Sequence, residues 1–240
     1  MSWDLKGKEI SVFITGNFSA DFIKIEARYK IGTRYKNRRQ RIIKCFCILL
    51  SADNNDLKRI RDMNFKDLKQ LCLSHGFTNV APLACDTIEL KPEVRQMCAS
   101  DSCHKYNKCW SCPPDCGTLE ECEQRVRKYK LGILVQTVGQ LEDSMDGEGM
   151  MRTEAMHKAS FYSLEKDLRK FYPNMLPIGA GCCTKCKTCT CPDAPCRFPD
   201  QAFSSMEAYG MLVMQVCQAN HLDYYYGPGK IAYTSCYLLK

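Results

Sequence analysis

Cysteine constrains this chain more than any other residue type, because 18 of its 240 residues are cysteines. Such a count can serve disulfides, metal binding or catalysis, and the cellular compartment decides among them. The first residues lack the basic start and apolar stretch of a secretory signal, and the longest apolar run, 45–50, is far shorter than the roughly 20 residues that span a bilayer. We therefore expect a cytoplasmic protein with no membrane segment, whose thiols bind metal and do not form disulfides.

The stronger of two cysteine groups lies between Cys182 and Cys196. Three of its cysteines follow one another at two-residue gaps, and a fourth comes after six intervening residues: Cys183, Cys186, Cys189 and Cys196. Thiolates that reach one point from different directions are what a 4Fe-4S cluster requires. We predict these four as ligands of such a cofactor. Cys182 and Cys191 are additional thiols with two open roles. Either they take the place of one of the four ligands, or they pack as small apolar side chains.

The other cysteine group is spread more widely, over residues 98–122. Its predicted ligands are Cys98, Cys103 and Cys112, with either Cys109 or Cys116 as a further metal ligand. Pro113 and Pro114 stiffen the loop after Cys112 and remove two backbone donors, which suits a preformed site. Cys122 falls inside a predicted helix, where we expect it only to pack. Spacing does not decide between Cys109 and Cys116.

Structural zinc is the alternative to iron and sulfide. The pairs Cys109-x2-Cys112 and Cys186-x2-Cys189 match the four-thiolate tetrahedral pattern, and a structural zinc ion needs no redox partner. Three successive cysteines at two-residue gaps exceed what one zinc ion usually takes from a single loop. The sequence therefore favours one or two iron-sulfur clusters over zinc.

Charge divides the chain into two parts. Residues 1–62 hold the whole net charge of +7, and a polar break at 51–62 separates them from the neutral remainder, which contains nearly all the cysteines. The densest basic stretch is 28–44, which we interpret as a solvated arm or hairpin, so we expect no nucleic acid partner. We predict a basic N-terminal extension over 1–62, partly of short strands, and a cysteine-rich metal-binding domain over 63–240.

Hydrophobic periodicity predicts alternating helices and strands after residue 63. Apolar residues at helical spacing predict helices over 65–75 and 149–171. A capping-box pattern at 118–121 predicts a helix over 118–130, and a second one at 204–207 predicts another helix behind it. Strands are expected at 79–90, 131–138, 175–180 and 231–239. This order implies an α/β sandwich of helices on a mixed sheet, with both cysteine-rich loops leading into capped helices.

Two segments resemble the signatures of a known family. They are CASDSCHKYNKCWSCPP at 98–114 and CTKCKTCTCPDAPCRFPDQAFSSMEAYG at 183–210. Both look like segments of the predicted metal-binding proteins of anaerobic bacteria and archaea known as domain of unknown function 2284. The resemblance covers about 63–240. The matching positions are Cys98, Cys103, Tyr106, Cys112, Pro113, Pro114, Cys183, Cys186, Cys189, Pro195, Cys196, Arg197, Met206, Glu207, Tyr209 and Gly210. The resemblance implies metal binding and names no reaction.

Together these patterns predict an iron-sulfur protein that acts in electron transfer or small-ligand redox chemistry. One four-cysteine cluster would transfer electrons, while an iron held by three cysteines at the second site would stay open to a thiol or sulfide. The partner would then be a redox protein or a small-molecule ligand. The alternatives are an electron carrier with closed clusters and a zinc-stabilised structural or interaction module. No pattern identifies a catalytic residue.

Overall fold

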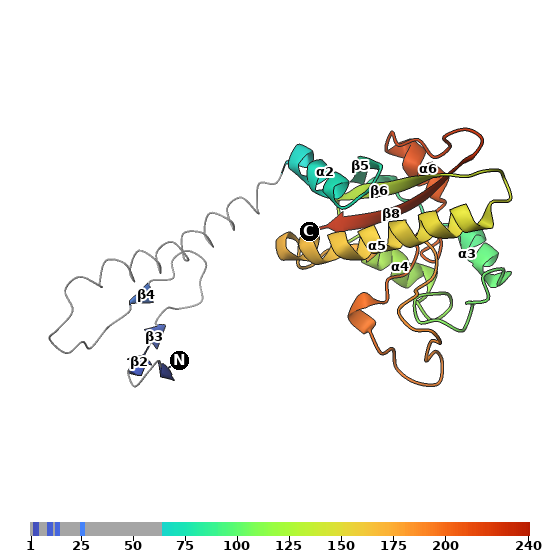
Figure 1. Cartoon of the computed structure of the whole chain (residues 1–240). Coiled ribbons are helices and arrows are strands. Elements are labelled where there is room, and N and C mark those ends of the chain that lie inside the picture. Colours follow the sequence, from blue (N-terminus) through green and yellow to red (C-terminus); the bar gives the residue numbers. More distant parts are fainter. Residues whose placement is uncertain (1, 5–8, 12, 15–24, 27–63) are drawn as a thin grey trace. The chain divides into compact units, whose positions relative to one another are not determined.

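The computed structural model describes residues 2–4, 9–11, 13–14, 25–26 and 64–240, and the chain divides into two units, 1–57 and 58–240 (Figure 1). In the first unit, β1 (Ser2–Asp4) pairs with β2 (Glu9–Ser11), and β3 (Phe13–Ile14) pairs with β4 (Ile25–Glu26), both antiparallel. The predicted basic arm, 28–44, and the predicted break at 51–62 lie outside the described residues. The division at residue 62 therefore stays a prediction.

The second unit is built on a four-stranded sheet in the order β5-β6-β8-β7. Its strands are β5 (Asn79–Ala84), β6 (Leu131–Gln140), β7 (Leu176–Ile178) and β8 (Lys230–Leu239). The α/β class is confirmed, but all three strand pairs are antiparallel and the expected mixed sheet is wrong. The last residue of β5, Ala84, pairs with the first residue of β6, Leu131, so the chain returns to the end of the sheet that it left.

Helices cover both faces of this sheet. Along β6, Ile133 and Val135 belong to one buried apolar cluster with α2 (Phe65–Ser74) and α5 (Gly147–Phe171). Leu134 belongs to the other cluster, with α4 (Leu119–Val126) and α6 (Val213–Ala219). Successive side chains of a strand point to opposite faces, so one strand contributes side chains to both clusters. The predicted sandwich of helices and sheet is thus present.

The longest helix, α5, lies along β6 and β8 (Figure 1). It begins where the Asp146 carboxylate accepts a hydrogen bond from Gly149 N at 2.8 Å, and it ends two residues before Pro173. Phe161, Leu164 and Leu168 form its buried face. Burying each such side chain contributes about 1.5–3 kcal/mol. In the described part of the chain, no helix is both long enough and apolar enough to cross a bilayer.

The first predicted capping box is confirmed. Thr118 Oγ1 accepts a hydrogen bond from Glu121 N at 3.2 Å, and the Glu121 carboxylate accepts one from Thr118 N at 2.9 Å. This reciprocal pair satisfies two free backbone donors at the start of α4. The helix ends at Val126, earlier than the predicted residue 130, with Tyr129 N bonded to Val126 O in the turn that follows.

The second predicted capping box is wrong. Residues 206–210 form turns, and the next helix, α6, begins only at Val213. Gly210 has φ +86°, a conformation that ends helical geometry, and its carbonyl accepts a 2.7 Å hydrogen bond from Lys91 N. Met211 then forms a β-bridge with Leu90. Contacts with a distant segment therefore keep residues 210–211 out of a helix.

A short helix that the sequence analysis did not predict, α3 (Pro92–Ala99), begins with proline at its first position. It carries Cys98, which was expected in a loop. The two remaining short elements are the 3-10 turns η1 (Cys85–Thr87) and η2 (Pro199–Gln201).

Candidate metal centre

Two loops carry the cysteine groups. The first, 100–118, joins α3 to α4, and the second, 179–212, joins β7 to α6. Trp110 Nε1 donates a hydrogen bond to Ala194 O at 3.1 Å, and this bond ties the first loop to the second. The fold thus brings together two cysteine-rich segments that lie about 80 residues apart in the chain.

The first loop is shaped by Asp101. Its carboxylate accepts hydrogen bonds from Tyr106 N at 2.8 Å and from Lys108 Nζ at 3.2 Å. Asp101, His104 and Asn107 have φ values of 53°, 56° and 54°, a left-handed conformation that Asp, Asn and His adopt more readily than most residues. These contacts fold 101–108 into successive tight turns and set the start of the CWSCPP segment.

Cys109 and Cys112 lie side by side in the first loop. Their exposed fractions are 3% and 8%, and Cys112 N donates a hydrogen bond to Cys109 O at 2.8 Å. Cys109 Sγ also lies 3.3 Å from Ser111 Oγ. A hydrogen bond from the Cys112 thiol is the largest cause that lowers the pKa of Cys109, and contacts with Ser111 and Cys189 lower it further. The pair therefore readily carries one negative charge.

Cysteines of the second loop meet this pair. Cys189 is one of the groups that lower the pKa of Cys109. The pKa of the Cys183 thiol is raised, first by burial and then by the nearby sulfurs of Cys109, Cys196 and Cys186, although the Lys185 N–H lowers it. Like charges at short range oppose one another, which accounts for these increases. Cys109 therefore has Cys183 and Cys189 of the second group among its neighbours.

Two further residues border this neighbourhood. Burial first, and then the Asp115 carboxylate, raise the pKa of the Cys191 thiol to about 12, and Cys189 and Cys109 add to the effect. The second oxygen of Asp115, Oδ2, is buried without a hydrogen-bond partner in the described residues. A buried carboxylate oxygen without a donor is costly, so it marks a place where a cation would be stabilised.

The remaining predicted ligands of the first group lie elsewhere. Cys98, on α3, has its sulfur 4.0 Å from Glu207 O, and its pKa is raised by burial, then by Glu207 and by Cys103. Cys103 is exposed. Cys98 and Cys103 thus lie near each other and near the second signature segment, while Cys112 belongs with Cys109. The predicted set of Cys98, Cys103 and Cys112 is not brought together around one point.

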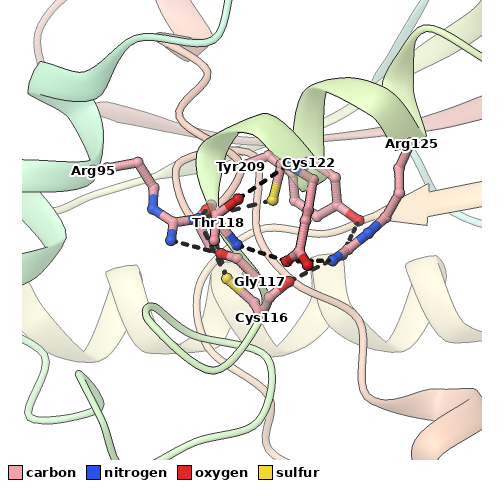
Figure 2. A network of polar contacts seen from close by, with 9 residues as sticks. Arg95, Cys116, Gly117, Thr118, Cys122, Arg125 and Tyr209 are labelled. Atoms are coloured by element: carbon pink, nitrogen blue, oxygen red, sulfur yellow. Dashed lines mark hydrogen bonds and ion pairs between the residues drawn. The ribbon is translucent and has the colours of Figure 1, made fainter.

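Cys116 forms a separate pair with Cys122, whose thiol sits on α4 (Figure 2). Both are buried, with exposed fractions of 6% and 0%. The guanidinium of Arg95 lies beside both sulfurs, at 3.5 Å from Cys116 Sγ and 3.8 Å from Cys122 Sγ. No sequence pattern pointed to Arg95, because its role depends on α3 and on contacts with distant segments.

The donor atoms suit a thiophilic metal, since every cysteine within 64–240 is a free thiol. Thiolates of this kind bind zinc and iron-sulfur clusters. Yet within the described residues no three Cys, His, Asp or Glu side chains stand close enough to hold one ion. The donor chemistry therefore fits a metal, and binding would draw the thiols of the two loops inward.

Fold and site together define a cysteine-rich α/β protein with two converging thiol loops. The comparison with protein families agrees with this class: residues 81–239 match the model of domain of unknown function 2284, described as a predicted metal-binding protein. The match covers more than half of the chain, so the protein belongs to this family, and the resemblance found in the sequence is confirmed. No curated protein and no solved structure matches the chain.

Proposed function

We propose that this protein binds an iron-sulfur cluster between its two cysteine loops and acts in electron transfer or in redox chemistry on a small ligand. The observation that carries the proposal is the proximity of Cys109 to Cys112 in its own loop and to Cys183 and Cys189 of the second loop. Thiolates from different chain segments are the ligands that such clusters take. Metal binding itself is the property described for the family.

This proposal changes the expected ligand set in one respect. Cys109 was an optional ligand of a site with Cys98 and Cys103, but its neighbours favour a centre shared with the second loop. The expected ligands are Cys183, Cys186, Cys189 and Cys196, with Cys109 and Cys112 as the nearest thiols of the first loop. A second cluster would be held by Cys98 and Cys103, close to Glu207.

When bound, a cluster of this kind accepts and donates single electrons. The chain's own residues would tune it. Lys185 Nζ lies 3.7 Å from the centroid of the Tyr162 ring, and burial first, then the nearby Cys183 thiol, raise the pKa of Tyr162. Lys158 Nζ donates to Cys182 O at 2.9 Å. Cationic groups and hydrogen bonds near the sulfurs favour the more negative, reduced state of a centre.

The function is tested by anaerobic purification of the full chain with analysis of iron, sulfide and zinc, combined with electron paramagnetic resonance. We expect iron and sulfide in equal amounts. Cys109→Ser and Cys189→Ser should both lower the iron content if the two loops share one centre, whereas the core variant Cys217→Ser should keep it. A colourless protein with stoichiometric zinc would overturn the iron-sulfur proposal.

A zinc-stabilised structural or interaction module is the second candidate. It is favoured by the contacts of Cys109 with Cys112 and with Cys189, because these three thiols belong to the two Cys-x2-Cys pairs of the tetrahedral pattern. Metal analysis separates the two candidates. For either one, we propose a cytoplasmic location, where thiols stay reduced, and a redox protein or small molecule as partner, without nucleic acid or membrane.

A further inference from the structure

The contact between Cys116 and Cys122 has features that a packing cysteine does not need. The two sulfurs lie beside the same nitrogen of Arg95, at 3.5 Å and 3.8 Å, one in the loop before α4 and the other in the first turns of that helix. Cys122 belongs to the same buried apolar cluster as Cys217, but its sulfur and that of Cys116 also lie beside a guanidinium group, as Figure 2 shows.

The guanidinium group of Arg95 contacts both sulfurs of this pair. Its Nη1 atom lies 3.5 Å from Cys116 Sγ and 3.8 Å from Cys122 Sγ, and donates to Ala208 O at 2.7 Å. Its Nη2 atom donates to Gly117 O at 2.8 Å. Within the described residues, no carboxylate accepts a hydrogen bond from this guanidinium. Its positive charge is therefore compensated best when one of the two sulfurs is a thiolate.

A second arginine holds the same loop from the other side. Arg125 Nη1 donates to Cys116 O at 2.9 Å and lies 3.3 Å from Tyr209 Oη (Figure 2). The backbone that carries Cys116 is thus fixed by one guanidinium and its sulfur is contacted by another. Two adjacent guanidinium groups make the pair a poor place for a metal cation, because the cation would lie beside fixed positive charges.

We propose that Cys116 and Cys122 are a redox-active dithiol, distinct from the metal centre, that closes to a disulfide when it is oxidised by a peroxide. The thiolate that Arg95 compensates attacks hydrogen peroxide, displaces hydroxide and becomes a sulfenic acid. The other thiol then attacks that sulfur, the disulfide forms, and the hydroxyl group leaves as water with the proton.

Overall, two thiols and one hydrogen peroxide give one disulfide and two waters, so the sulfurs lose two electrons and the peroxide gains them. A dithiol reductant such as dithiothreitol reverses the step by thiol exchange. Arg95 favours the forward reaction by stabilising the attacking thiolate. It acts on the sulfurs as a positioning and charge-compensating group.

The test treats the full chain with hydrogen peroxide, blocks the remaining thiols by alkylation and digests with a protease that cleaves after glutamate. Glu120 and Glu121 lie between the two cysteines, so a disulfide leaves their peptides joined. The fragment that carries Cys116 also holds Cys98, Cys103, Cys109 and Cys112, so tandem mass spectrometry assigns the linked sulfur. We expect a joined Cys116–Cys122 peptide pair that dithiothreitol separates and that Cys116→Ser does not form. Cys217→Ser should still form it, and Arg95→Gln should form it about tenfold more slowly, as expected for a thiol whose pKa rises by about one unit.

Two results would overturn the proposal. In one, the peptides of Cys116 and Cys122 are recovered separately after oxidation, although circular dichroism shows the native fold. In the other, Cys116→Ser lowers the iron or zinc content of the purified protein, because the sulfur would then be a metal ligand. The peptide test does not require bound metal, so the dithiol and the metal centre can fail independently.

Discussion

His157 lies in the core between α5 and the sheet, with an exposed fraction of 0%. Its Nδ1 atom is 2.9 Å from Thr137 Oγ1, and its Nε2 atom is 2.7 Å from Ser235 Oγ. Burial first, and the charge of nearby Lys158 second, lower the pKa of this imidazole to about 3. The native state therefore keeps His157 neutral at any pH at which the protein is handled.

This burial predicts a loss of stability in mild acid. An imidazole in the unfolded chain has a pKa of about 6.5, so below that pH the unfolded state binds a proton that the folded state excludes. The free energy of unfolding should fall by about 1.4 kcal/mol per pH unit, or roughly 2 kcal/mol from pH 6.5 to 5. Urea titrations at both pH values measure it. His157→Gln should flatten this dependence, whereas exposed His221→Gln should not; equal slopes in all three proteins would refute the assignment.

Gly117 gives a second prediction at the residue scale. It has φ +105°, and a Cβ atom would overlap the Arg125 and Glu121 side chains. Gly117→Ala should therefore cost about 1–2 kcal/mol of backbone strain alone and should move Arg125 away from Cys116 O. The matched control is Gly147→Ala at the start of α5, where a Cβ would meet no atom within 4 Å. Urea midpoints at equal m values compare the two, and similar midpoints would contradict the role given to Gly117.

Individual side chains were predicted unevenly from the sequence. The burial of Cys122 was foreseen, because its helix was evident from the Thr118 capping box. Its contact with Arg95 was not foreseen, because that residue lies on α3, which the analysis did not predict, and reaches the thiol through the tertiary fold. The spacing of the cysteines in the sequence identifies candidate ligands, but it does not show which sulfurs lie close together in the fold.

At the scale of elements, the capping box of α4 supports a direct comparison. Thr118→Ala removes the hydroxyl that accepts from Glu121 N, and should lower the free energy of unfolding by about 1 kcal/mol. Ser204→Ala, in the segment with the same sequence pattern but no helix, should cost less because no helix start depends on it. Thermal or urea unfolding of both variants measures the difference. A larger effect at Ser204 would mean that residues 204–207 do cap a structure.

The two capping-box patterns show why local sequence was sufficient in one case and misleading in the other. At Thr118 the following residues are free to form a helix, and local hydrogen bonds decide. At Ser204–Glu207 the chain must reach the β-bridge of Met211 with Leu90 and the hydrogen bond of Gly210 O with Lys91 N. Those partners lie over 100 residues away, so a local pattern carries no information about them.

The relative direction of the strands was predicted wrongly for a similar reason. The strands at 79–84, 131–140, 176–178 and 230–239 were all predicted approximately, because apolar runs mark them. Whether neighbours run parallel or antiparallel depends on where the intervening segment returns to the sheet. Here 85–130 leaves from Ala84 and returns opposite it at Leu131, so the excursion that carries the first cysteine group begins and ends at one end of the sheet.

At the scale of the whole molecule, the sheet lies between two apolar clusters. Residues of the face with α2 and α5 make one apolar cluster, and those of the face with α4 and α6 make the other. Both cysteine loops are held by short bonds at their edges, including Trp110 Nε1 to Ala194 O. The scaffold can therefore stay folded while the loops adjust around a bound metal.

The same clusters predict that residues 63–240 fold without the preceding 62. Among residues 64–240, which the structure describes, the members of both clusters lie between Leu68 and Leu239, and the family match begins only at residue 81. A fragment starting at Met63 keeps Asn64, whose side chain accepts a hydrogen bond from Asp67 N at the start of α2. It should therefore unfold cooperatively and retain the metal content of the full chain per molecule. Circular dichroism, urea titration and metal analysis of both proteins test this.

A fragment starting at Phe77 serves as the control. It lacks Leu68 and Cys72, two buried residues of the cluster beneath α5. Its free energy of unfolding should fall by several kcal/mol, as expected when two buried side chains are lost. If the Met63 fragment were insoluble or free of metal while the full chain was loaded, residues 1–62 would be part of the metal-binding domain.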